Sequence, residues 1–523
     1  MIFRLGVDVG GTMTDAVILD DKDHVMAKAK VPNSENIQDG IASAVRTVLQ
    51  SSGVERADVA LAMLGTTQVT NAIIERRGLA PVLALRLGAP ATTGIRPLAA
   101  WPDDLAKFGR AHAQIVGGGH EFDGRTISRL DEGAIRDAAR DARGRVAAVA
   151  VTGVFSPVSE DHEERAAEIV REEMGDIPVT LSHQIGSIGL LERENAAILN
   201  AMVNRVADRI TETFGRAVRE AGLEARLFLA QNDGTLMDLD AARRYPIFTI
   251  ACGPTNSMRG AAFLSRQTDA LVADIGGTST DVGILHRGFP RESAVAVEVG
   301  GVRTNFRMPD LVSIGLGGGS VIRGKGERVT VGPESVGQAI VREGEAFGGD
   351  TATFTDAAVR LGYGPVGDPA KVRIGVDLAR RAHERAMAML VDALARLKTS
   401  AAPIPLVAVG GGSFTLPAVL EEISEIIRPE HYEVANAIGA AMAQVSGRVD
   451  RIYAMEGRRR EDVLAEAESQ ARENAREAGA DPESLVVVDI EEVPLSYLPG
   501  NATRVRVTVA GELLRQDVRE ARA

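Results

Sequence analysis

Two short stretches of the sequence carry the same acidic, glycine and threonine residues, half a molecule apart. Residues 7–19 read VDVGGTMTDAVIL and residues 273–285 read ADIGGTSTDVGIL, with eight of thirteen positions identical at an offset of 266 (274 minus 8). Each stretch places an aspartate, Asp8 or Asp274, near the end of an apolar run and separated by one residue from two glycines. Such a loop can bind an anion, because glycine lets backbone N–H groups approach it and threonine adds hydroxyl donors.

The two loops fit the phosphates and the magnesium ion of a nucleotide. A carboxylate beside a phosphate repels it unless a cation lies between them, so Asp8 and Asp274 are predicted to hold Mg²⁺, directly or through its waters. The order strand, turn, strand predicts a β-hairpin, unlike the GxxxxGK[ST] loop that precedes a helix. The alternative is a pair of tight turns without a ligand, and the repetition argues against it. The predicted phosphate-binding residues are Gly10, Gly11, Thr12, Thr14, Gly276, Gly277, Thr278 and Thr280.

Two further glycine clusters could contact the same nucleotide. Gly410, Gly411 and Gly412 follow an apolar run and precede a stretch that we expect to be helical up to about residue 423. Beside the two loops, this cluster is the place where the ribose and base of a nucleotide would lie against backbone. The cluster GGGS at 317–320 is either another anion cradle or a flexible connection.

The composition is that of a globular protein with several domains. At 523 residues the chain is long enough for two or three of them. The net charge of −13 argues against a nucleic-acid-binding surface, which needs concentrated lysine and arginine. A single cysteine, Cys252, excludes an intramolecular disulfide and a CxxC zinc site. Without a long apolar window or a leader-like N-terminus, we expect a soluble, cytoplasmic protein with no membrane partner.

Strands and helices alternate along the chain, which indicates an α/β fold. Short apolar runs predict strands, and apolar residues at helical spacing predict helices. Residues 88–145 are rich in glycine and arginine and are expected to form a loop or insertion. The tail after residue 450 is expected to be a charged helix and two strands around a Leu-Pro-Gly-Asn turn. The predicted helices span about 35–51, 66–78, 159–175, 190–222 and 457–479.

The two loops, followed by a strand and a GGG cluster, resemble the actin-like ATPase superfamily. Within it, GVDVGGTMTDAVILD and DIGGTSTDVGIL are similar to the hydantoinase/oxoprolinase family. The resemblance runs from residue 1 to about 445, and the order and spacing of its motifs hold. Other stretches that agree are LGTTQVTNAIIERRG (64–78), VFSPVSEDHE (154–163), LERENAAILNAMV (191–203), SIGLGGGS (313–320), VGPESVG (331–337), ATFTDAAVRLG (352–362) and ANAIGAA (435–441).

The resemblance implies an α/β fold with two actin-like (ribonuclease H-like) ATPase domains around a nucleotide cleft. We expect these domains at residues 1–185 and 186–450, and a small α+β appendage at 451–523. It further implies ATP and Mg²⁺ as cofactors and the hydrolysis of a cyclic amide, such as a hydantoin or 5-oxoproline, often with a second subunit. Phosphorylation of the amide oxygen would activate the ring towards water. The implied phosphate and Mg²⁺ site contains Asp8, Thr12, Asp15, Asp274, Thr278 and Asp281, with Asp8, Asp15 and Asp274 as catalytic residues and Asp8 or Asp15 orienting the phosphoryl acceptor.

Three departures from the family pattern affect the neighbourhood of this site. Family members usually read Asp-x-His-Thr-Ile-Gly before the third glycine cluster, whereas here Asp310 is present and Val312 replaces the histidine. The usual Ser-Gly-Pro-Ala-Gly-Gly is ACGPTNSMRG, so Cys252 replaces serine and two glycines are lost. A lone cysteine is more often inert packing than a nucleophile. Third, longer members carry a large C-terminal domain, and we expect about seventy residues of this sequence to correspond to it.

Histidines and partners leave several alternatives open. His120 and His183 could face a substrate cleft or lie in surface loops. The same fold could serve a small-molecule kinase that releases its phosphorylated product, or a non-enzymatic ATPase switch such as a reactivating chaperone. We expect an oligomer, and neither the substrate nor the need for a second subunit follows from the sequence.

Overall fold

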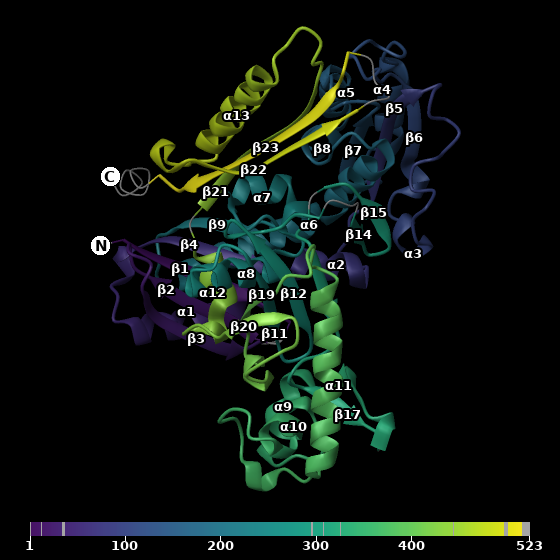
Figure 1. Cartoon of the computed structure of the whole chain (residues 1–523). Helices are drawn as coiled ribbons and strands as arrows, with labels where there is room; N and C mark the ends of the chain where they lie inside the picture. The colour runs from purple at the N-terminus through teal and green to yellow at the C-terminus, as the bar shows by residue number, and fades with distance from the viewer. Residues whose placement is uncertain are drawn as a thin grey trace.

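The computed structural model describes residues 2–11, 13–33, 37–293, 297–306, 308–324, 326–442, 444–495 and 500–514. The molecule is elongated, with the N-terminal strands (purple) near its middle (Figure 1). The segment around residues 270–430 (green) extends below them, and residues 444–514 (yellow) and 82–181 (blue) form the top. The first threonine of the N-terminal loop, Thr12, lies outside the described residues.

The first sheet is built around the N-terminal hairpin. Five of its strands are β1 (Phe3–Val9), β2 (Met13–Leu19), β3 (Val25–Pro32), β4 (Val59–Thr66) and β9 (Arg226–Ala230). Their order is β3-β2-β1-β4-β9; β1, β2 and β3 are antiparallel, and β4 and β9 continue in parallel with β1. Every residue of β4 is buried, which explains why its sequence is hydrophobic without alternation.

The second sheet repeats this order. Its strands are β11 (Ala270–Ile275), β12 (Thr280–His286), β13 (Phe289–Pro290), β16 (Leu311–Ile314), β19 (Ile404–Val409) and β20 (Ile423–Ile427). They run β13-β12-β11-β19-β20, with β16 also paired to β12. The register repeats too, because Asp8 lies opposite Asp15 in the first hairpin and Asp274 opposite Asp281 in the second. The predicted fold class, two ribonuclease H-like halves of the actin-like type, is confirmed.

The first sheet continues beyond these five strands to a total of nine. Its further strands are β10 (Leu236–Asp238), β21 (Gln444–Tyr453), β23 (Thr503–Glu512) and β22 (Val486–Pro494). Helix α13 (Arg460–Glu477) covers one face of the C-terminal strands. The backbone of α13 lies directly against that of β21, since a Cβ on Gly447 of β21 would lie 2.1 Å from the amide nitrogen of Ala475 in the helix.

This strand pairing crosses the domain boundaries that we predicted. β9 and β10 fall within the predicted second domain, and β22 and β23 fall within the predicted appendage, yet all four belong to the first sheet. We therefore propose that the first domain continues to about residue 250 and includes the C-terminal segment. The predicted boundaries at 185 and 450 followed sequence order, which strand pairing between distant segments does not respect.

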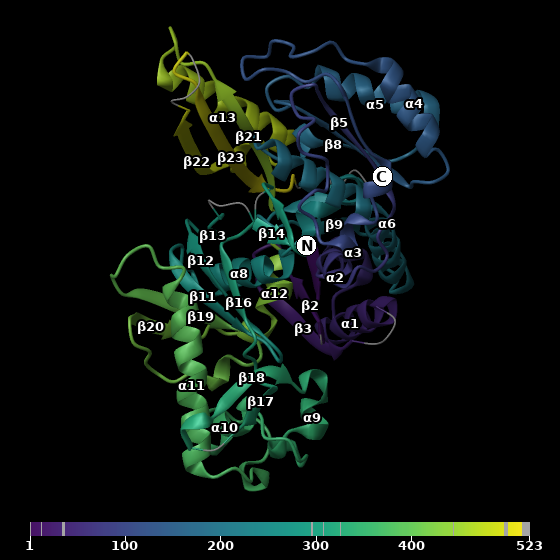
Figure 2. The ribbon, with the colours of Figure 1, turned by 90° about the vertical axis from the view of Figure 1, so that its right-hand side faces the viewer.

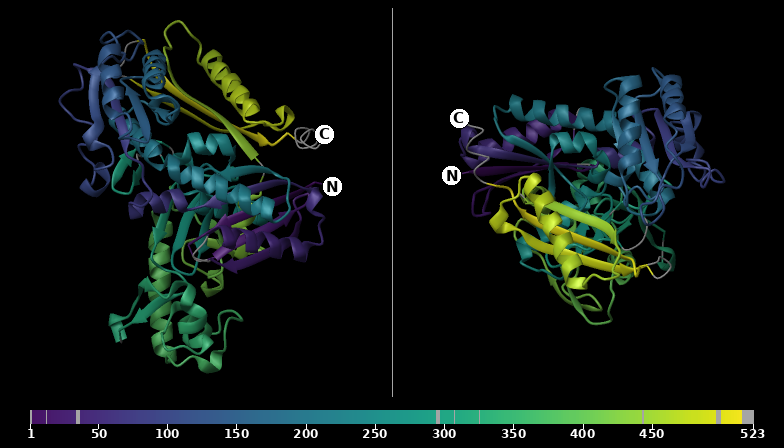
Figure 3. Two further views of the ribbon diagram at one scale, coloured as in Figure 1. Left: turned by 180° about the vertical axis from the view of Figure 1, so that it is seen from behind. Right: turned by 90° about the horizontal axis from the view of Figure 1, so that it is seen from above.

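Residues 82–181 form a separate four-stranded parallel sheet. Its order is β6-β5-β7-β8, with helices α4 (Glu132–Ala142) and α5 (Asp161–Met174) packed against it. The segment 88–145, expected to be a loop or insertion, contains β6 and α4, whereas the GGHEFDGR stretch (118–125) after β6 forms no helix or named strand. Figures 2 and 3 show this sheet beside the C-terminal strands. The strands are β5 (Val82–Ala89), β6 (Ala113–Gly117), β7 (Ala148–Gly153) and β8 (Val179–Leu181).

Helices fill the space around and between the two main sheets. Those of the first half are α1 (Ile37–Ser52), α2 (Gln68–Glu75), α3 (Asp103–Ala106), α6 (Leu190–Glu220) and α7 (Leu239–Arg244). Between the halves lie α8 (Cys252–Ser265) and α12 (Ala435–Ala440). The second half has α9 (Ile340–Glu343), α10 (Phe354–Arg360), α11 (Val376–Ala395) and two small sheets, β14 (Val297–Val299) with β15 (Val302–Thr304) and β17 (Ser320–Arg323) with β18 (Thr330–Ser335).

Most predicted helices are present, but one is not. The stretch after Gly412 forms a single 3-10 turn at Ser413–Thr415 and then leads to β20, instead of the expected helix up to about residue 423. Pro417 interrupts this stretch and lacks the N–H that a continuing helix needs. Among the described residues, no helix is long and apolar enough to cross a bilayer.

Candidate functional site

The two repeated hairpins face one cavity of about 590 Å³. This size lies within the range of small-molecule and cofactor sites. The tips of the hairpins, Gly11 and Gly277, are exposed, and a Cβ on either glycine would meet no atom within 4 Å. The predicted residues that line the cavity are Asp8, Gly10, Gly11, Asp15, Asp274, Gly276, Gly277, Thr278, Asp281, Gly410, Gly411 and Gly412.

The hairpin turns have the same geometry in both halves. In the first, the Gly10 N–H donates to the carbonyl oxygen of Met13 over 3.1 Å, and in the second the Gly276 N–H donates to that of Ser279 over 2.9 Å. Each turn thus brings an aspartate at the end of one strand opposite an aspartate on the next. The repeat seen in the sequence is a repeat of local structure, and the cavity lies between the two copies.

Asp8 is buried and held by two asparagines from distant helices. Asn256 of α8 donates from Nδ2 to Oδ1 of Asp8 over 3.1 Å. Asn436 of α12 donates from Nδ2 to Oδ2 of Asp8 over 3.0 Å and to Oδ2 of Asp15 over 2.9 Å. The carboxylate of Asp8 is therefore fixed in orientation before any ligand binds.

Close packing of α8 against α12 brings the two asparagines together. A Cβ on Gly260 would lie 1.9 Å from the carbonyl oxygen of Ala435, and a Cβ on Gly439 would lie 1.8 Å from that of Asn256. Only glycine permits this approach of one helix backbone to the other. The ANAIGAA motif thus has a structural role, since its glycine lets its asparagine reach the hairpin.

The second hairpin is held by serines. Ser257, next to Asn256 on α8, donates to Oδ2 of Asp274 over 2.5 Å, and Ser313 of β16 donates to Oδ1 of Asp281. Asn256 and Ser257 stand where the family pattern usually has two glycines. The lost glycines are therefore replaced by side chains that hydrogen-bond one aspartate from each half.

The electrostatics of the cavity call for a cation. Burial raises the pKa of Asp8 to about 7 despite the hydrogen bonds from Asn256 and Asn436, and the charge of Asp15 adds to the rise. Burial also raises the pKa of Asp281 to about 6 and shifts that of Asp274 upward. Lys30 is the one cation among the described lining residues. A set of hard carboxylate oxygens with too little positive charge fits Mg²⁺, so the residues present suit the ion that the sequence predicted.

The fourth glycine cluster lies directly against the second hairpin. Gly410 follows β19 with φ of +80°, and a Cβ there would lie 2.1 Å from Oδ1 of Asp274. The Gly412 N–H donates to the carbonyl oxygen of Ile275 over 2.7 Å. Glycine at 410 therefore allows both the left-handed backbone and the approach to the aspartate.

The third glycine cluster supports the hairpin and does not form a separate cradle. The N–H groups of Gly318 and Gly319 donate to the carbonyl oxygens of Gly276 and Gly277 over 3.0 and 2.7 Å. Because these two N–H groups are already hydrogen-bonded within the fold, they are not available to bind an anion at this cluster.

Two of the predicted threonines point into the protein. Thr14 is buried and donates to Oδ1 of Asn33 over 2.8 Å, and Thr280 is buried and donates to the carbonyl oxygen of Leu316 over 2.6 Å. Their hydroxyls are used inside the fold, so we no longer place them among the phosphate donors. Strand alternation explains this, because Thr14 and Thr280 directly precede Asp15 and Asp281, which line the cavity, and successive residues of a strand point to opposite faces. Thr278 is exposed and lines the cavity.

Asp310, Val312 and Cys252 have structural surroundings. Asp310 accepts from Nη2 of Arg291 over 2.6 Å and lies outside the cavity lining. Val312, which replaces the family histidine, packs against the hydrophobic core of the second half. Cys252 is buried, its Sγ contacts both backbone groups of Thr66, and burial raises its pKa to about 12. A thiol with so high a pKa is inert at neutral pH, as the sequence led us to expect.

His120 and His183 lie outside the hairpin cavity. His120 is buried, packs against the tilted ring of His162 with 4.3 Å between ring centroids, and is not among the lining residues of this cavity. Its Nε2 lies 3.3 Å from Oδ1 of Asp161. The ligand atoms of the three side chains lie close together, but Nδ1 of His162 accepts the Gly119 N–H over 3.0 Å, so the neutral ring carries its proton on Nε2 and offers no free nitrogen to an ion. His183 lines a second cavity.

The sequence did not identify Lys30, Asn256, Ser257 or Asn436 as site residues. None belongs to a glycine loop, and their roles depend on partners elsewhere in the chain. The signal that could have found them is their position in stretches already singled out, since Asn436 lies in ANAIGAA and the others lie in or beside motifs of the two halves.

Comparison with known proteins identifies the family to which the chain is similar. Residues 4–174 match the model of the hydantoinase/oxoprolinase N-terminal region, and residues 193–384 match the hydantoinase/oxoprolinase model. The caprolactamase alpha subunit of Pseudomonas jessenii is 28% identical over 69% of this chain and 54% of its own length. The acetophenone carboxylase gamma subunit of Aromatoleum aromaticum is also 28% identical, over 69% of this chain and 53% of its own.

A solved structure shows the same fold. The crystal structure of the ATP-dependent caprolactamase from Pseudomonas jessenii matches with a TM-score of 0.79 at 21% identity, covering 98% of this chain and 88% of that one. The chain spans about half the length of the curated relatives it matches (54% and 53%). The two family models together cover most of the chain, and they match it one after the other, at residues 4–174 and 193–384. The chain belongs to the hydantoinase/oxoprolinase family.

Proposed function

We propose that this protein uses ATP to open a cyclic amide, such as a lactam, hydantoin or 5-oxoproline. The observation that carries the proposal is the pair of equivalent hairpins that place Asp8 and Asp274 on one cavity with the glycines of residues 410–412. The similarity to an ATP-dependent caprolactamase supports the choice of a cyclic amide.

A ring amide resists water because resonance stabilises its carbonyl group. Transfer of the γ-phosphoryl group of ATP to the amide oxygen releases ADP and makes the ring carbon electrophilic. Water then adds to that carbon, the ring C–N bond breaks with protonation of the nitrogen, and the acyl phosphate left behind is hydrolysed. The products are one chain with a carboxylate and an amine (or a carbamoyl group), together with ADP and phosphate.

Residues of this chain bind and orient the reactants, which is most of what phosphoryl transfer needs. Asp8 and Asp274 would hold Mg²⁺, which neutralises charge on the transferred phosphoryl group. The turns at Gly10–Gly11 and Gly276–Gly277, with Thr278, would contact the phosphates, and residues 410–412 would lie along the ribose and base. Asp8, fixed by Asn256 and Asn436, is the better candidate for orienting the phosphoryl acceptor, because Asp15 is paired with Lys30.

A second candidate function is ATP-dependent carboxylation of a ketone. The acetophenone carboxylase subunit is as similar in sequence to this chain as the caprolactamase subunit. Both reactions begin with phosphoryl transfer to an oxygen atom, so the same cavity serves either. The two differ in whether bicarbonate becomes part of the product.

The test is to incubate the purified protein with Mg-ATP and panels of lactams, hydantoins and cyclic imides, and separately with ketones and labelled bicarbonate. Ring opening that is stoichiometric with ADP release supports the proposal, and label fixed in a carboxylate product supports the second candidate. A stable phosphorylated small molecule would identify a kinase instead. ATP turnover that responds to no small molecule would point to a switch.

Each assay should be run with and without a candidate second subunit. The matched relatives are named as alpha and gamma subunits, so we propose that this chain also works in a multi-subunit enzyme. Activity that appears only on mixing two purified chains would support this assignment. Full activity of the single chain would contradict it.

A further inference from the structure

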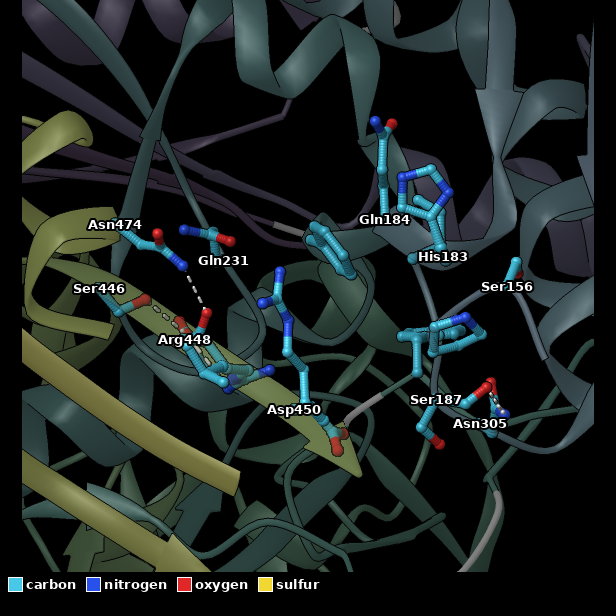
Figure 4. Close-up of a pocket in the computed structure, with 18 of the residues that line it drawn as sticks. Ser156, His183, Gln184, Ser187, Gln231, Asn305, Ser446, Arg448, Asp450 and Asn474 are labelled. Atoms are coloured by element: carbon cyan, nitrogen blue, oxygen red, sulfur yellow. Dashed lines mark hydrogen bonds and ion pairs between the residues drawn. The ribbon is translucent and has the colours of Figure 1, made fainter. Parts of the chain in front are cut away.

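A second cavity, of about 410 Å³, lies apart from the hairpin cavity. It is formed where three segments meet: the β5–β8 sheet with the loop after β8, the end of β9, and the C-terminal strands with α13. Figure 4 shows Ser156, His183 and Ser187 on one wall and Ser446, Arg448 and Asn474 on the wall opposite. No lining residue of this cavity is shared with the hairpin cavity. Cavities at such junctions are common places for small molecules to bind.

One corner of this cavity is built around a buried carboxylate and a histidine. Glu163 is fully buried, and its Oε2 accepts from Nδ1 of His183 over 2.7 Å. Its Oε1 accepts the Gly153 N–H over 2.6 Å and the hydroxyl of Ser182 over 2.5 Å. Because a carboxylate only accepts, Nδ1 of His183 carries the proton, and its Nε2 is left free of the Glu163 bond.

Two further carboxylates make this corner acidic. Glu160 and Glu164 each place an oxygen 3.7 Å from Nε2 of His183, and the carboxylate of Glu160 is exposed. Burial lowers the pKa of His183, but its hydrogen bond to Glu163 and the charges of Glu163, Glu160 and Glu164 outweigh this effect, so that the pKa lies above its usual value. Even with His183 protonated, the three carboxylates outnumber the two nearby cations, His183 and the buried Arg193 that interacts with Glu163. The corner therefore favours a cationic group from a ligand.

The opposite wall presents one unpaired positive charge. Arg448 pairs with Glu292 over 2.7 Å, and Asp450 accepts from Nη2 of Arg504 over 2.6 Å, so these charges are neutralised within the protein. Arg451 also lines the cavity, and within the described part of the chain its side chain makes no ion pair or hydrogen bond. This wall therefore favours an anionic group, for which a guanidinium is a bidentate donor.

We propose that this cavity binds a small linear zwitterion, with its ammonium group at the acidic corner of Glu160 and His183 and its carboxylate at Arg451. The two charged ends lie on walls that come from different segments, so one molecule must bridge them. Polar side chains between the walls, such as Ser156, Ser187 and Gln231, can contact the chain that joins the ends.

The class of ligand connects the cavity to the reaction. Opening a lactam produces a linear molecule with an amine at one end and a carboxylate at the other, which is the charge pattern that the two walls favour. This link rests on the proposed function, whereas the binding of a zwitterion does not. The cavity is then a product or effector site, separate from the site of phosphoryl transfer.

Isothermal titration calorimetry on the full chain without nucleotide tests the proposal. The probes are 5-aminopentanoate and 6-aminohexanoate, with hexanoate and hexylamine as analogues that carry one charge each. We expect saturable binding of at least one amino acid, and binding of each single-charge analogue at least about tenfold weaker. Arg451→Ala and Glu160→Gln should each weaken binding of the amino acid about tenfold, since each removes the charged group that pairs with one end of the ligand.

Matched controls separate this site from the protein surface at large. Arg459→Ala and Glu168→Gln remove an exposed charge of the same sign outside the cavity lining and should leave the affinity unchanged. Absence of saturable binding, equal affinity for the single-charge analogues, or insensitivity to both Arg451→Ala and Glu160→Gln would overturn the proposal. Zwitterion binding by a protein that opens no cyclic amide would support this site and contradict the proposed function. Opening of a cyclic amide by a protein that binds no zwitterion would support the proposed function and contradict this site.

Discussion

The ammonium group of Lys30 contacts both carboxylate oxygens of Asp15, at 2.6 and 2.7 Å. Lys30 lies on β3, directly opposite Asp15 in the strand register, and it is the one cation that lines the hairpin cavity among the described residues. Asp15 is therefore neutralised within the protein, while Asp8 is held only by neutral amides. The two aspartates of one hairpin thus have different tasks.

Replacing Lys30 with methionine should weaken ATP binding by about tenfold or more. The change leaves Asp15 as an uncompensated carboxylate beside the phosphates, and it removes the positive charge that opposes their repulsion. Fluorescence titration with a labelled ATP analogue measures the effect. Lys22→Met is the control, because Lys22 is exposed in the turn before β3 and lies outside the cavity lining. An equal loss in both variants would contradict a specific role for Lys30.

Asp8→Asn and Asp274→Asn should each reduce ATP turnover by about a hundredfold or more, since each removes a carboxylate from the proposed Mg²⁺ site. Steady-state ADP release at saturating Mg-ATP gives the rate, and the melting temperature shows that the variants fold. Asp269→Asn, an exposed carboxylate just before β11 that pairs with His286, serves as the comparison. Unchanged ATP binding and turnover in both site variants would refute the site assignment.

Gly410→Ala should destabilise the protein by about 1–3 kcal/mol, because alanine is strained at φ of +80° and its Cβ would meet Asp274. Gly411→Ala adds a methyl group one residue later, where nothing lies within 4 Å, and should change stability by less than about 0.5 kcal/mol. Thermal unfolding without nucleotide compares the two. Equal melting temperatures would show that the backbone at 410 can relax.

The nucleotide-free protein in a metal chelator should lose stability as the pH rises from about 4 to 7. Burial holds the pKa of Asp8 near 7 in the folded state, against 3.8 for the unconstrained group. The unfolded state therefore releases this proton first, and stability that is present below the unfolded pKa is lost as the pH rises through the folded one. The loss attributable to Asp8 is about 2–4 kcal/mol.

Melting temperatures of the wild type and of Asp8→Asn across this pH range provide the measurement. The variant has no carboxyl group to ionise at position 8, so its melting temperature should fall less between pH 4 and 7. Parallel pH profiles for the two proteins would show that Asp8 does not titrate in this range. Asp269→Asn again provides the comparison for loss of an exposed carboxylate.

Local parts of the candidate site could be predicted from the sequence. Each hairpin is a continuous stretch of about thirteen residues whose turn and register follow from its own glycines and alternating side chains. The repetition of that stretch indicated two halves of one fold, and the placement of Asp8 and Asp274 on one cavity agrees with this. Thr14 and Thr280 show the limit of such local reasoning, because their hydroxyls are taken by partners outside the loops.

The parts that the sequence missed depend on contacts between distant residues. Asn256 and Asn436 lie 248 and 428 positions from Asp8. No local sequence pattern in either helix predicts that its asparagine binds this carboxylate. The nine-stranded sheet likewise joins β4 to β9 and β10 to β21, so its extent could not be read in sequence order. Such pairings are decided by which surfaces are buried together once the chain has folded.

The sequence by itself determined the two hairpins, the family and the duplicated architecture, because turns, strands and glycine loops are set by neighbouring residues. Only the tertiary structure decided which groups support the aspartates, where the C-terminal segment belongs, and that a second cavity pairs an acidic corner with Arg451. The physical reason is the same in each case. Hydrogen bonds, burial and charge balance depend on distance in space, and the folded chain brings together residues that the sequence keeps apart.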